Sequence, residues 1–270
     1  MLRQQHQRLL EDRTLTGGSR LHGVLWIQGW AADPSIWRTC IEHLPQYQHR
    51  FVDFATCESP ADLESVIERH IAALPDATSD GSAAPTDWSI VGWSLGALLL
   101  LQSLLRAPAA SSTARSWVGS IGIVGGTLCF TSAHSWPKRV IERMRARLRD
   151  DPAQCLRQFN RLMFSDREWS RPEIRDVAER PSTAWTPNGL DAGLQMLGQI
   201  DLRSLWSEHV HALPPLRWLH GQCDAVCPIE AVPHHWPPAA RFETLPCGHA
   251  PFITQPRLFA SWLTALIECR

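Results

Sequence analysis

The sequence predicts an α/β protein in which a mostly parallel sheet is flanked by helices and carries an inserted helical segment. Short apolar runs alternate with amphipathic helical patterns up to residue 129. The alternation is lost between residues 130 and 200, and it resumes from residue 201. Because strands joined by helices run parallel and are buried on both faces, we expect one core from residues 1–129 and 201–270, with residues 130–200 as a helical cap.

The composition is that of an ordinary globular protein, with 44% hydrophobic and 20% charged residues in a chain of 270. A formal net charge of -1 gives no reason to expect nucleic acid or a membrane surface as a partner. No apolar run approaches the ~18 residues of a membrane span, and residues 1–20 lack the apolar core of a signal peptide. We therefore expect a cytoplasmic protein whose cysteines are free thiols.

The first elements are placed by apolar runs and by helix-start signals. Asp33 and Ser59 each precede a proline, which is the arrangement of an N-cap followed by the first helical residue. Apolar residues at helical spacing follow both of them. The expected elements are strands at 24–27 and 51–54, helices at 33–44 and 59–74, and a Ser/Ala/Pro/Gly-rich loop at 76–86.

The central motif is the turn Gly92-Trp93-Ser94-Leu95-Gly96, between an apolar strand and an apolar helix that runs to Arg106. The two glycines leave room for the neighbouring strand and helix, and the tight turn holds the serine in a strained conformation above the sheet edge. A Gly-x-Ser-x-Gly turn in this position is typical of the nucleophile elbow of α/β-hydrolases. The alternative is an ordinary strand–helix turn with a surface serine.

The remaining elements continue the same pattern on either side of the cap. A buried strand at 118–124 ends in Gly125-Gly126-Thr127. In the cap, one helix begins after Ser135-Trp136-Pro137 and the next begins at Asp151-Pro152. The expected closing elements are strands at 216–220 and 241–245, a short helix at 229–235 and an amphipathic helix at 258–269.

Ser94, Asp224 and His249 occur in the order in which the triad residues of this architecture follow one another, each after a strand. A serine hydroxyl needs a base to become nucleophilic, and an acid orients that base. We expect His249 to act as the base and Asp224 to orient it. The strand before Gly125-Gly126-Thr127 is followed by no carboxylate, which leaves Asp224 as the candidate acid.

An ester carbonyl that becomes tetrahedral needs N–H donors for its oxyanion. We expect the backbone N–H groups of Trp30 and Leu95 to supply them, the first from the loop after strand 24–27 and the second from the residue after the nucleophile. Large rings near the site predict an apolar substrate pocket, for which we select Trp30, Trp93 and the cap residue Phe159. We expect no cofactor.

Three cysteines lie close to His249 in the sequence and raise the alternative of a zinc site. The cysteines are Cys223, Cys227 and Cys247. Their spacing is not that of a familiar structural zinc site, and small buried thiols explain them equally well. We therefore expect no metal.

The cap is basic, with eight Lys or Arg residues against three acids between residues 131 and 165. Arg139 and Arg143, and likewise Arg157 and Arg161, are four residues apart, so each pair shares a helix face. These arginines are candidates for a docking face that receives an acidic partner. A solvated helix surface is the alternative.

The chain resembles the pimeloyl-[acyl-carrier-protein] methyl ester esterases of biotin synthesis. The resemblance extends over about residues 21–270 and rests on the elbow, the cap exit and the residues around the expected acid and base, at 92–96, 189–190, 200–203, 221–228 and 249–253. It implies a monomeric cytosolic esterase that cleaves the methyl ester of a pimeloyl-carrier protein, with cap arginines gripping the acidic carrier and Trp30 and Trp93 lining the acyl channel. The chain departs from the family in having Gln28-Gly29-Trp30 where His-Gly-Trp is usual.

Two other function classes remain open. One is a general carboxylesterase, a thioesterase or a C–C bond hydrolase that uses the same triad on another acyl group. The other is a non-catalytic binding protein on a hydrolase scaffold, which the intact set of Ser94, Asp224 and His249 disfavours.

Overall fold

The computed structural model describes residues 22–74, 87–106, 118–179, 184–233, 236–238 and 240–268. Its centre is a six-stranded sheet in which each strand is parallel to its neighbours, in the order β2-β1-β3-β4-β5-β6. The strands are β1 (His22–Ile27), β2 (Gln48–Phe51), β3 (Asp87–Trp93), β4 (Val118–Val124), β5 (Leu216–Gly221) and β6 (Ala240–Leu245). The predicted parallel α/β sheet is confirmed, while the loop predicted at 76–86 lies outside the described residues.

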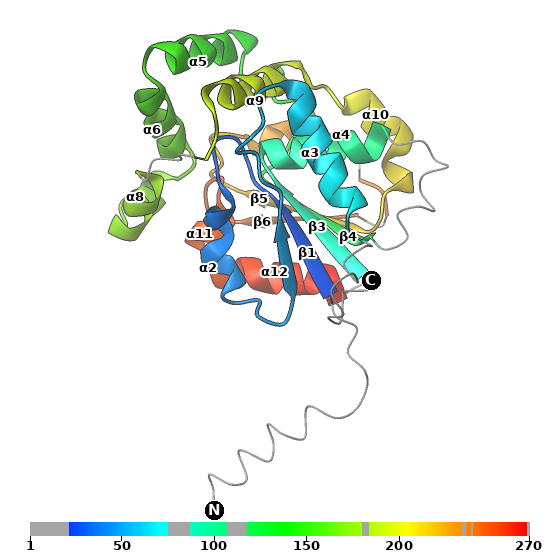
Figure 1. The fold of residues 1–270 in the computed structure, drawn as a ribbon. Helices are drawn as coiled ribbons and strands as arrows, with labels where there is room; N and C mark the ends of the chain where they lie inside the picture. The colour runs from blue at the N-terminus through cyan, green and yellow to red at the C-terminus, as the bar shows by residue number, and fades with distance from the viewer. Residues whose placement is uncertain are drawn as a thin grey trace, which may run out of the picture.

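Helices cover both faces of the sheet (Figure 1). One face carries α3 (Pro60–Ala72), α4 (Leu95–Arg106) and α10 (Arg203–His209), which leads into the short η4 (Val210–Ala212). The other face carries α12 (Pro256–Glu268), with α2 (Arg38–Ile41) and α11 (Pro251–Thr254) beside it. The four inner strands, β1, β3, β4 and β5, are therefore largely buried on both sides, as their apolar runs predicted.

Two predicted boundaries are wrong. The strand predicted at 51–54 lies at 48–51, because β2 is an edge strand whose polar residues hide it, and the apolar Val52 and Phe54 are buried beyond its end. Of the helix predicted at 229–235, the described residues 229–233 form only the single turn η5 (Ile229–Ala231), and residues 234–235 lie outside the described part of the chain. Pro233 accounts for this early end, since a proline disfavours helical geometry in the residue before it.

Predicted helix starts agree well with the structure. Asp33 caps the short η1 (Pro34–Trp37) by accepting a hydrogen bond from the Ser35 N–H at 2.7 Å, and α2 follows directly. Ser59 caps α3 in the same way by accepting from the Asp62 N–H. In both cases a polar side chain satisfies a backbone donor that the first helical turn leaves free.

The helical segment between β4 and β5 lies over the carboxyl ends of the strands (Figure 1). It contains α5 (Lys138–Asp150), α6 (Pro152–Leu162), α7 (Asp166–Trp169), α8 (Pro172–Ala178) and α9 (Pro187–Gln199). Its two ends meet in an antiparallel bridge between Cys129 and Asp201, next to a hydrogen bond from the Leu202 N–H to the Leu128 carbonyl at 2.8 Å. This pairing lies at the boundaries that we proposed for the cap. No helix in the described ranges is long and apolar enough to cross a membrane.

Candidate active site

Ser94 occupies a strained turn between β3 and α4. Its φ angle is 56°, in the left-handed region that non-glycine residues seldom adopt. The flanking glycines are required by space: a Cβ at Gly92 would lie 2.7 Å from the Ala97 Cα, and one at Gly96 would lie 2.4 Å from the Ile27 carbonyl oxygen. A strained serine in such a turn has the geometry expected of a nucleophile elbow.

Asp224 and His249 meet at the same edge of the sheet, although 25 residues separate them. The His249 Nδ1–H donates to Asp224 Oδ2 at 2.7 Å, and both side chains are buried. The other oxygen of Asp224 accepts the backbone N–H groups of Val226 and Cys227 at 2.9 and 2.8 Å. The carboxylate is therefore fixed on both oxygens and in turn sets the orientation of the imidazole.

The backbone of His249 is also held. Its N–H donates to the Met163 carbonyl at 2.7 Å, and its carbonyl accepts the indole N–H of Trp93 at 2.9 Å. The remaining ring nitrogen, Nε2, forms no hydrogen bond with any described residue. This arrangement leaves Nε2 free to receive a proton, which is what a general base requires.

A second histidine lies beside the carboxylate. His220, at the end of β5, is completely buried, and its Nε2 lies 3.6 Å from Asp224 Oδ2. The same nitrogen donates to the Cys227 carbonyl at 2.7 Å, while Nδ1 accepts the indole N–H of Trp218 at 3.4 Å. Burial lowers the pKa of His220, and the neighbouring Asp224 opposes that shift.

The loop after β1 approaches the nucleophile closely. A Cβ added at Gly29 would lie 3.0 Å from the Cβ of Ser94, and Ala31 has a φ of 61°. Gln28, the residue that departs from the family pattern, is fully buried and donates through its amide to the Val52 carbonyl at 2.8 Å. Leu95 opens α4, so its N–H has no carbonyl within the helix to bind.

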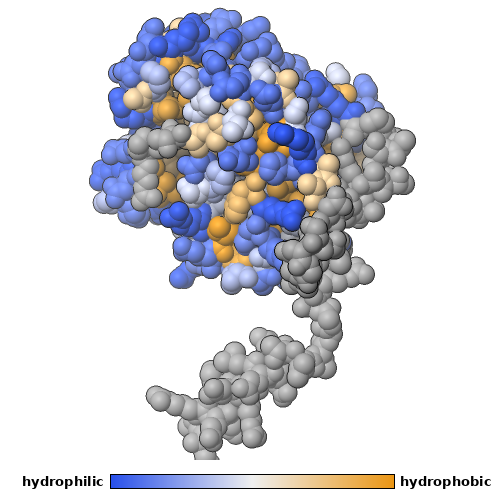
Figure 2. All heavy atoms as spheres, viewed as in Figure 1, coloured by the Kyte–Doolittle hydropathy of each residue, from blue (hydrophilic) through white to orange (hydrophobic). Residues whose placement is uncertain are grey.

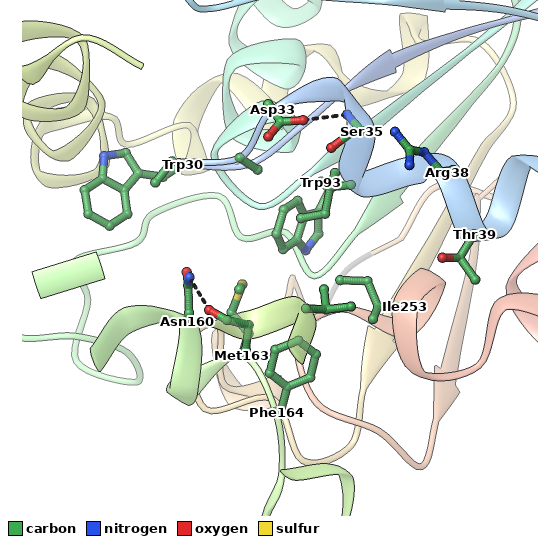
Figure 3. A pocket seen from close by; sticks show the side chains of 15 residues that line it. Trp30, Asp33, Ser35, Arg38, Thr39, Trp93, Asn160, Met163, Phe164 and Ile253 are labelled. Atoms are coloured by element: carbon green, nitrogen blue, oxygen red, sulfur yellow. Dashed lines mark hydrogen bonds between the residues drawn. The ribbon is translucent and has the colours of Figure 1, made fainter. Parts of the chain in front are cut away.

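Trp30 and Trp93 line a cavity of about 330 Å³ between the core and the cap, and Figure 3 shows both rings at its wall. The cap contributes Asn160, Met163 and Phe164 to the same wall. Phe159, the third predicted pocket residue, packs edge-on against Trp30 with ring centroids 4.9 Å apart. Ser94 is 6% exposed and His249 is fully buried, so both are largely shielded from solvent in this structure.

The predicted docking arginines divide into two groups. Arg139, Arg143 and Arg157 are exposed, and no described residue forms an ion pair or hydrogen bond with their side chains. Arg161 is already engaged: it donates to the Phe164 carbonyl at 2.7 Å, pairs with Asp166 and stacks on Trp169. The surface over α5 and α6 is largely hydrophilic (Figure 2).

The structure brings no metal-binding group together in the part of the chain that it describes. Cys227 is fully buried and Cys247 lies in the core, whereas Cys223 is exposed. Burial raises the pKa of Cys247 to about 12, so its thiol is protonated at neutral pH.

Three residues near the site escaped the predictions. They are the buried polar residues His220, Gln28 and Glu168. No local sequence pattern predicts that these polar side chains are buried. The His220 side chain follows an apolar run, which is the one signal that could have placed it beside Asp224. Glu168 belongs to a capping box with Ser165, but that local motif does not predict its contact with Gly248, which crosses from the cap to the core.

Comparison with known proteins assigns the class. The profile of the alpha/beta hydrolase family matches residues 21–262, and the chain belongs to that family. Among relatives, a pimeloyl-[acyl-carrier protein] methyl ester esterase of Nitrosomonas europaea is 29% identical over 261 residues, covering 90% of this chain and 94% of the relative. A protein of the same name from Edwardsiella ictaluri is 26% identical over 269 residues, covering 94% and 96%.

The fold is shared with solved esterases. An esterase of Exiguobacterium antarcticum superposes with a TM-score of 0.73 at 19% identity, over 92% of each chain. The predicted α/β-hydrolase fold is confirmed, and so is the resemblance to the pimeloyl-carrier esterases. The family match and the esterase names of the relatives support the predicted class, a carboxylic ester hydrolase.

Proposed function

We propose that this chain is a serine esterase that hydrolyses the methyl ester of a pimeloyl-carrier protein, with Ser94, His249 and Asp224 as its catalytic triad. The observation that carries the proposal is the combination of a strained Ser94 with an oriented His249 whose Nε2 has no partner in the described chain. A strained nucleophile beside a free, carboxylate-held imidazole is the arrangement on which acyl transfer depends.

In the proposed mechanism, the Ser94 oxygen attacks the ester carbonyl while His249 Nε2 takes the hydroxyl proton. The Trp30 and Leu95 N–H groups bind the oxyanion, and collapse of the intermediate releases methanol with the proton from His249. Water, deprotonated by His249, then attacks the acyl-enzyme and frees the acid. Neither step requires a cofactor.

The substrate assignment rests on the relatives, whose names specify pimeloyl-[acyl-carrier protein] methyl ester esterases. The cavity beside Trp30 and Trp93 provides mixed polar and apolar walls for the acyl chain. The exposed Arg139, Arg143 and Arg157 supply positive charge for an acidic carrier. The cytoplasmic location and the monomeric state stay predictions from the sequence.

Substrate comparison tests this proposal. We expect kcat/KM for the methyl ester of a pimeloyl-carrier protein to exceed that for free methyl pimelate, and Ser94→Ala to abolish both reactions. Equal rates on the two substrates would contradict the carrier-linked assignment and favour a general carboxylesterase. A Ser94→Ala variant with near-wild-type turnover would contradict the serine mechanism itself.

A further inference from the structure

The cap contacts the backbone of the loop that carries His249. The Gly248 N–H donates to Glu168 Oε2 at 2.8 Å, and the next N–H, that of His249, donates to the Met163 carbonyl at 2.7 Å. Met163 directly follows α6, and Glu168 lies in the short helix α7 that comes next in the cap. Two successive N–H groups of the loop are therefore held by the cap and not by the sheet that precedes them.

Glu168 is suited to this contact because its acceptor oxygen is fixed. The residue is 7% exposed, and Oε2 also accepts the N–H and O–H of Ser165 at 2.9 and 2.8 Å. The bond from the Ser165 N–H belongs to the capping box that starts α7, in which the Glu168 N–H donates in return to Ser165 Oγ. The bond from Gly248 is not part of any capping box, and it joins positions 80 residues apart.

The two segments approach each other closely. A Cβ at Gly248 would lie 2.4 Å from the Met163 carbonyl oxygen and 3.0 Å from Glu168 Oε2. A side chain at this position would therefore force the loop away from the cap. The glycine is explained by the contact itself, since its backbone needs no positive φ.

Arg161 stiffens the connection between α6 and α7, the helix that carries Glu168. Its guanidinium donates to the Phe164 carbonyl, pairs with Asp166 and lies 4.8 Å from the centre of the Trp169 ring. These contacts join the end of α6 to both ends of α7. Because the N–H groups of Gly248 and His249 are hydrogen-bonded to Glu168 and Met163, a rigid connection between α6 and α7 also fixes the position of the loop that carries His249.

We infer that Glu168 is a positioning residue, which fixes the backbone of Gly248 and so aligns the proposed base His249 with Ser94. Glu168 touches no reacting atom and acts only through the loop. The inference rests on the proposed function, because it presupposes that His249 is the base. It gives the cap a second role, in which it supports the triad as well as covering it.

The test compares Glu168→Ala and Glu168→Gln with the wild-type chain on a small p-nitrophenyl ester. Glu168→Ala removes the acceptor, and we expect kcat to fall about 10²-fold, the loss typical of a catalytic group displaced by ~1 Å. KM should stay nearly constant because the small ester does not contact Glu168. Glu168→Gln keeps an acceptor oxygen for the Gly248 N–H and should recover most of the lost kcat.

Glu142→Ala is the matched control, because Glu142 is an exposed glutamate of the same cap on α5. It should leave kcat and KM unchanged. Urea titration of each variant gives its folded fraction, by which kcat is normalised. A merely structural role would lower the stability of Glu168→Ala and leave the normalised kcat intact, and this result would overturn the inference.

Two further outcomes are decisive. Equal loss of normalised kcat in Glu168→Ala and Glu168→Gln would show that the retained acceptor does not position the loop. Ser94→Ala, measured in the same assay, separates this inference from the proposed function. If Ser94→Ala is inactive while Glu168→Ala keeps full kcat, only the positioning role fails; if Ser94→Ala is active, the serine mechanism fails.

Discussion

His220 Nε2 lies 3.6 Å from the same Asp224 oxygen that accepts the His249 Nδ1–H at 2.7 Å. One carboxylate oxygen thus faces two imidazoles, those of His220 and His249. His220 is completely buried and bonded at both ring nitrogens to neutral partners. The hydrogen bond to the Cys227 carbonyl fixes the tautomer with a proton on Nε2.

This geometry makes folding stability depend on pH. Because burial lowers the pKa of His220, the unfolded chain binds a proton at this residue at pH values where the folded chain does not. The contribution of neutral His220 to the free energy of unfolding is fully present above about pH 6.5, the ordinary pKa of histidine. It is lost as pH falls below that value, at up to ~1.4 kcal/mol per pH unit for one group. Urea denaturation at pH 7.5 and 5.5 measures the loss.

His220→Gln should lose less stability than the wild type over this pH range, because glutamine can donate to the Cys227 carbonyl but does not titrate. His49, whose pKa burial also lowers, is present in both chains and contributes equally to each. The same loss of stability in His220→Gln and in the wild type would show that His220 is not responsible.

Ser94→Ala should lower kcat by ~10⁴–10⁶ for any ester substrate, since no other group at the elbow supplies the nucleophile. The fold should persist, because Ser94 Oγ donates no hydrogen bond on which the elbow depends in the described structure. Turnover and the circular-dichroism melt are measured together. An inactive variant with a collapsed melt would leave the loss attributable to unfolding, in which case Ser94→Gly serves as the second variant.

Charge reversal of Arg139, Arg143 and Arg157 to Glu should raise KM for a carrier-linked ester. It should leave kcat/KM for a small p-nitrophenyl ester nearly unchanged, because that substrate does not need a charged face. Added salt should weaken only the carrier reaction, since exposed charges are screened over ~8 Å at physiological ionic strength.

The control for this reversal is the pair Arg69→Glu and Arg257→Glu, two exposed arginines on α3 and α12 of the core. They change the net charge in the same direction but lie outside the cap. An equal rise in KM from the core reversals would mean that overall charge, and not the cap face, draws the carrier.

Cys223 should be the thiol that iodoacetamide modifies most rapidly among the seven described cysteines, because it is the exposed one. Burial raises the pKa of Cys247 to about 12 and that of Cys57 to about 11, so neither presents a thiolate at pH 7.5. Peptide mapping by mass spectrometry identifies the modified residue, and Cys223→Ser is the control. Modification of Cys247 in the native protein at a comparable rate would show that its loop opens.

The sequence by itself determined the class of fold, the elbow at Ser94 and the order of Asp224 and His249 after their strands. These features are local, because apolar runs, helix caps and a five-residue turn each depend only on residues that are close together in the sequence. Parallel strands end at one edge of a sheet, so the order of residues after the strands was enough to predict that Asp224 and His249 would meet.

Only the tertiary structure decided which buried polar groups surround Asp224 and His249. No local sequence pattern specifies the contacts involved. They are the hydrogen bond from Gly248 to Glu168, the approach of His220 to Asp224, and the hydrogen bond from Arg161 to the Phe164 carbonyl. The displaced edge strand β2 has the same explanation, since pairing with β1 and not the apolar run sets its position. Such contacts depend on how the cap and the loops pack, and packing energy is a property of the assembled chain.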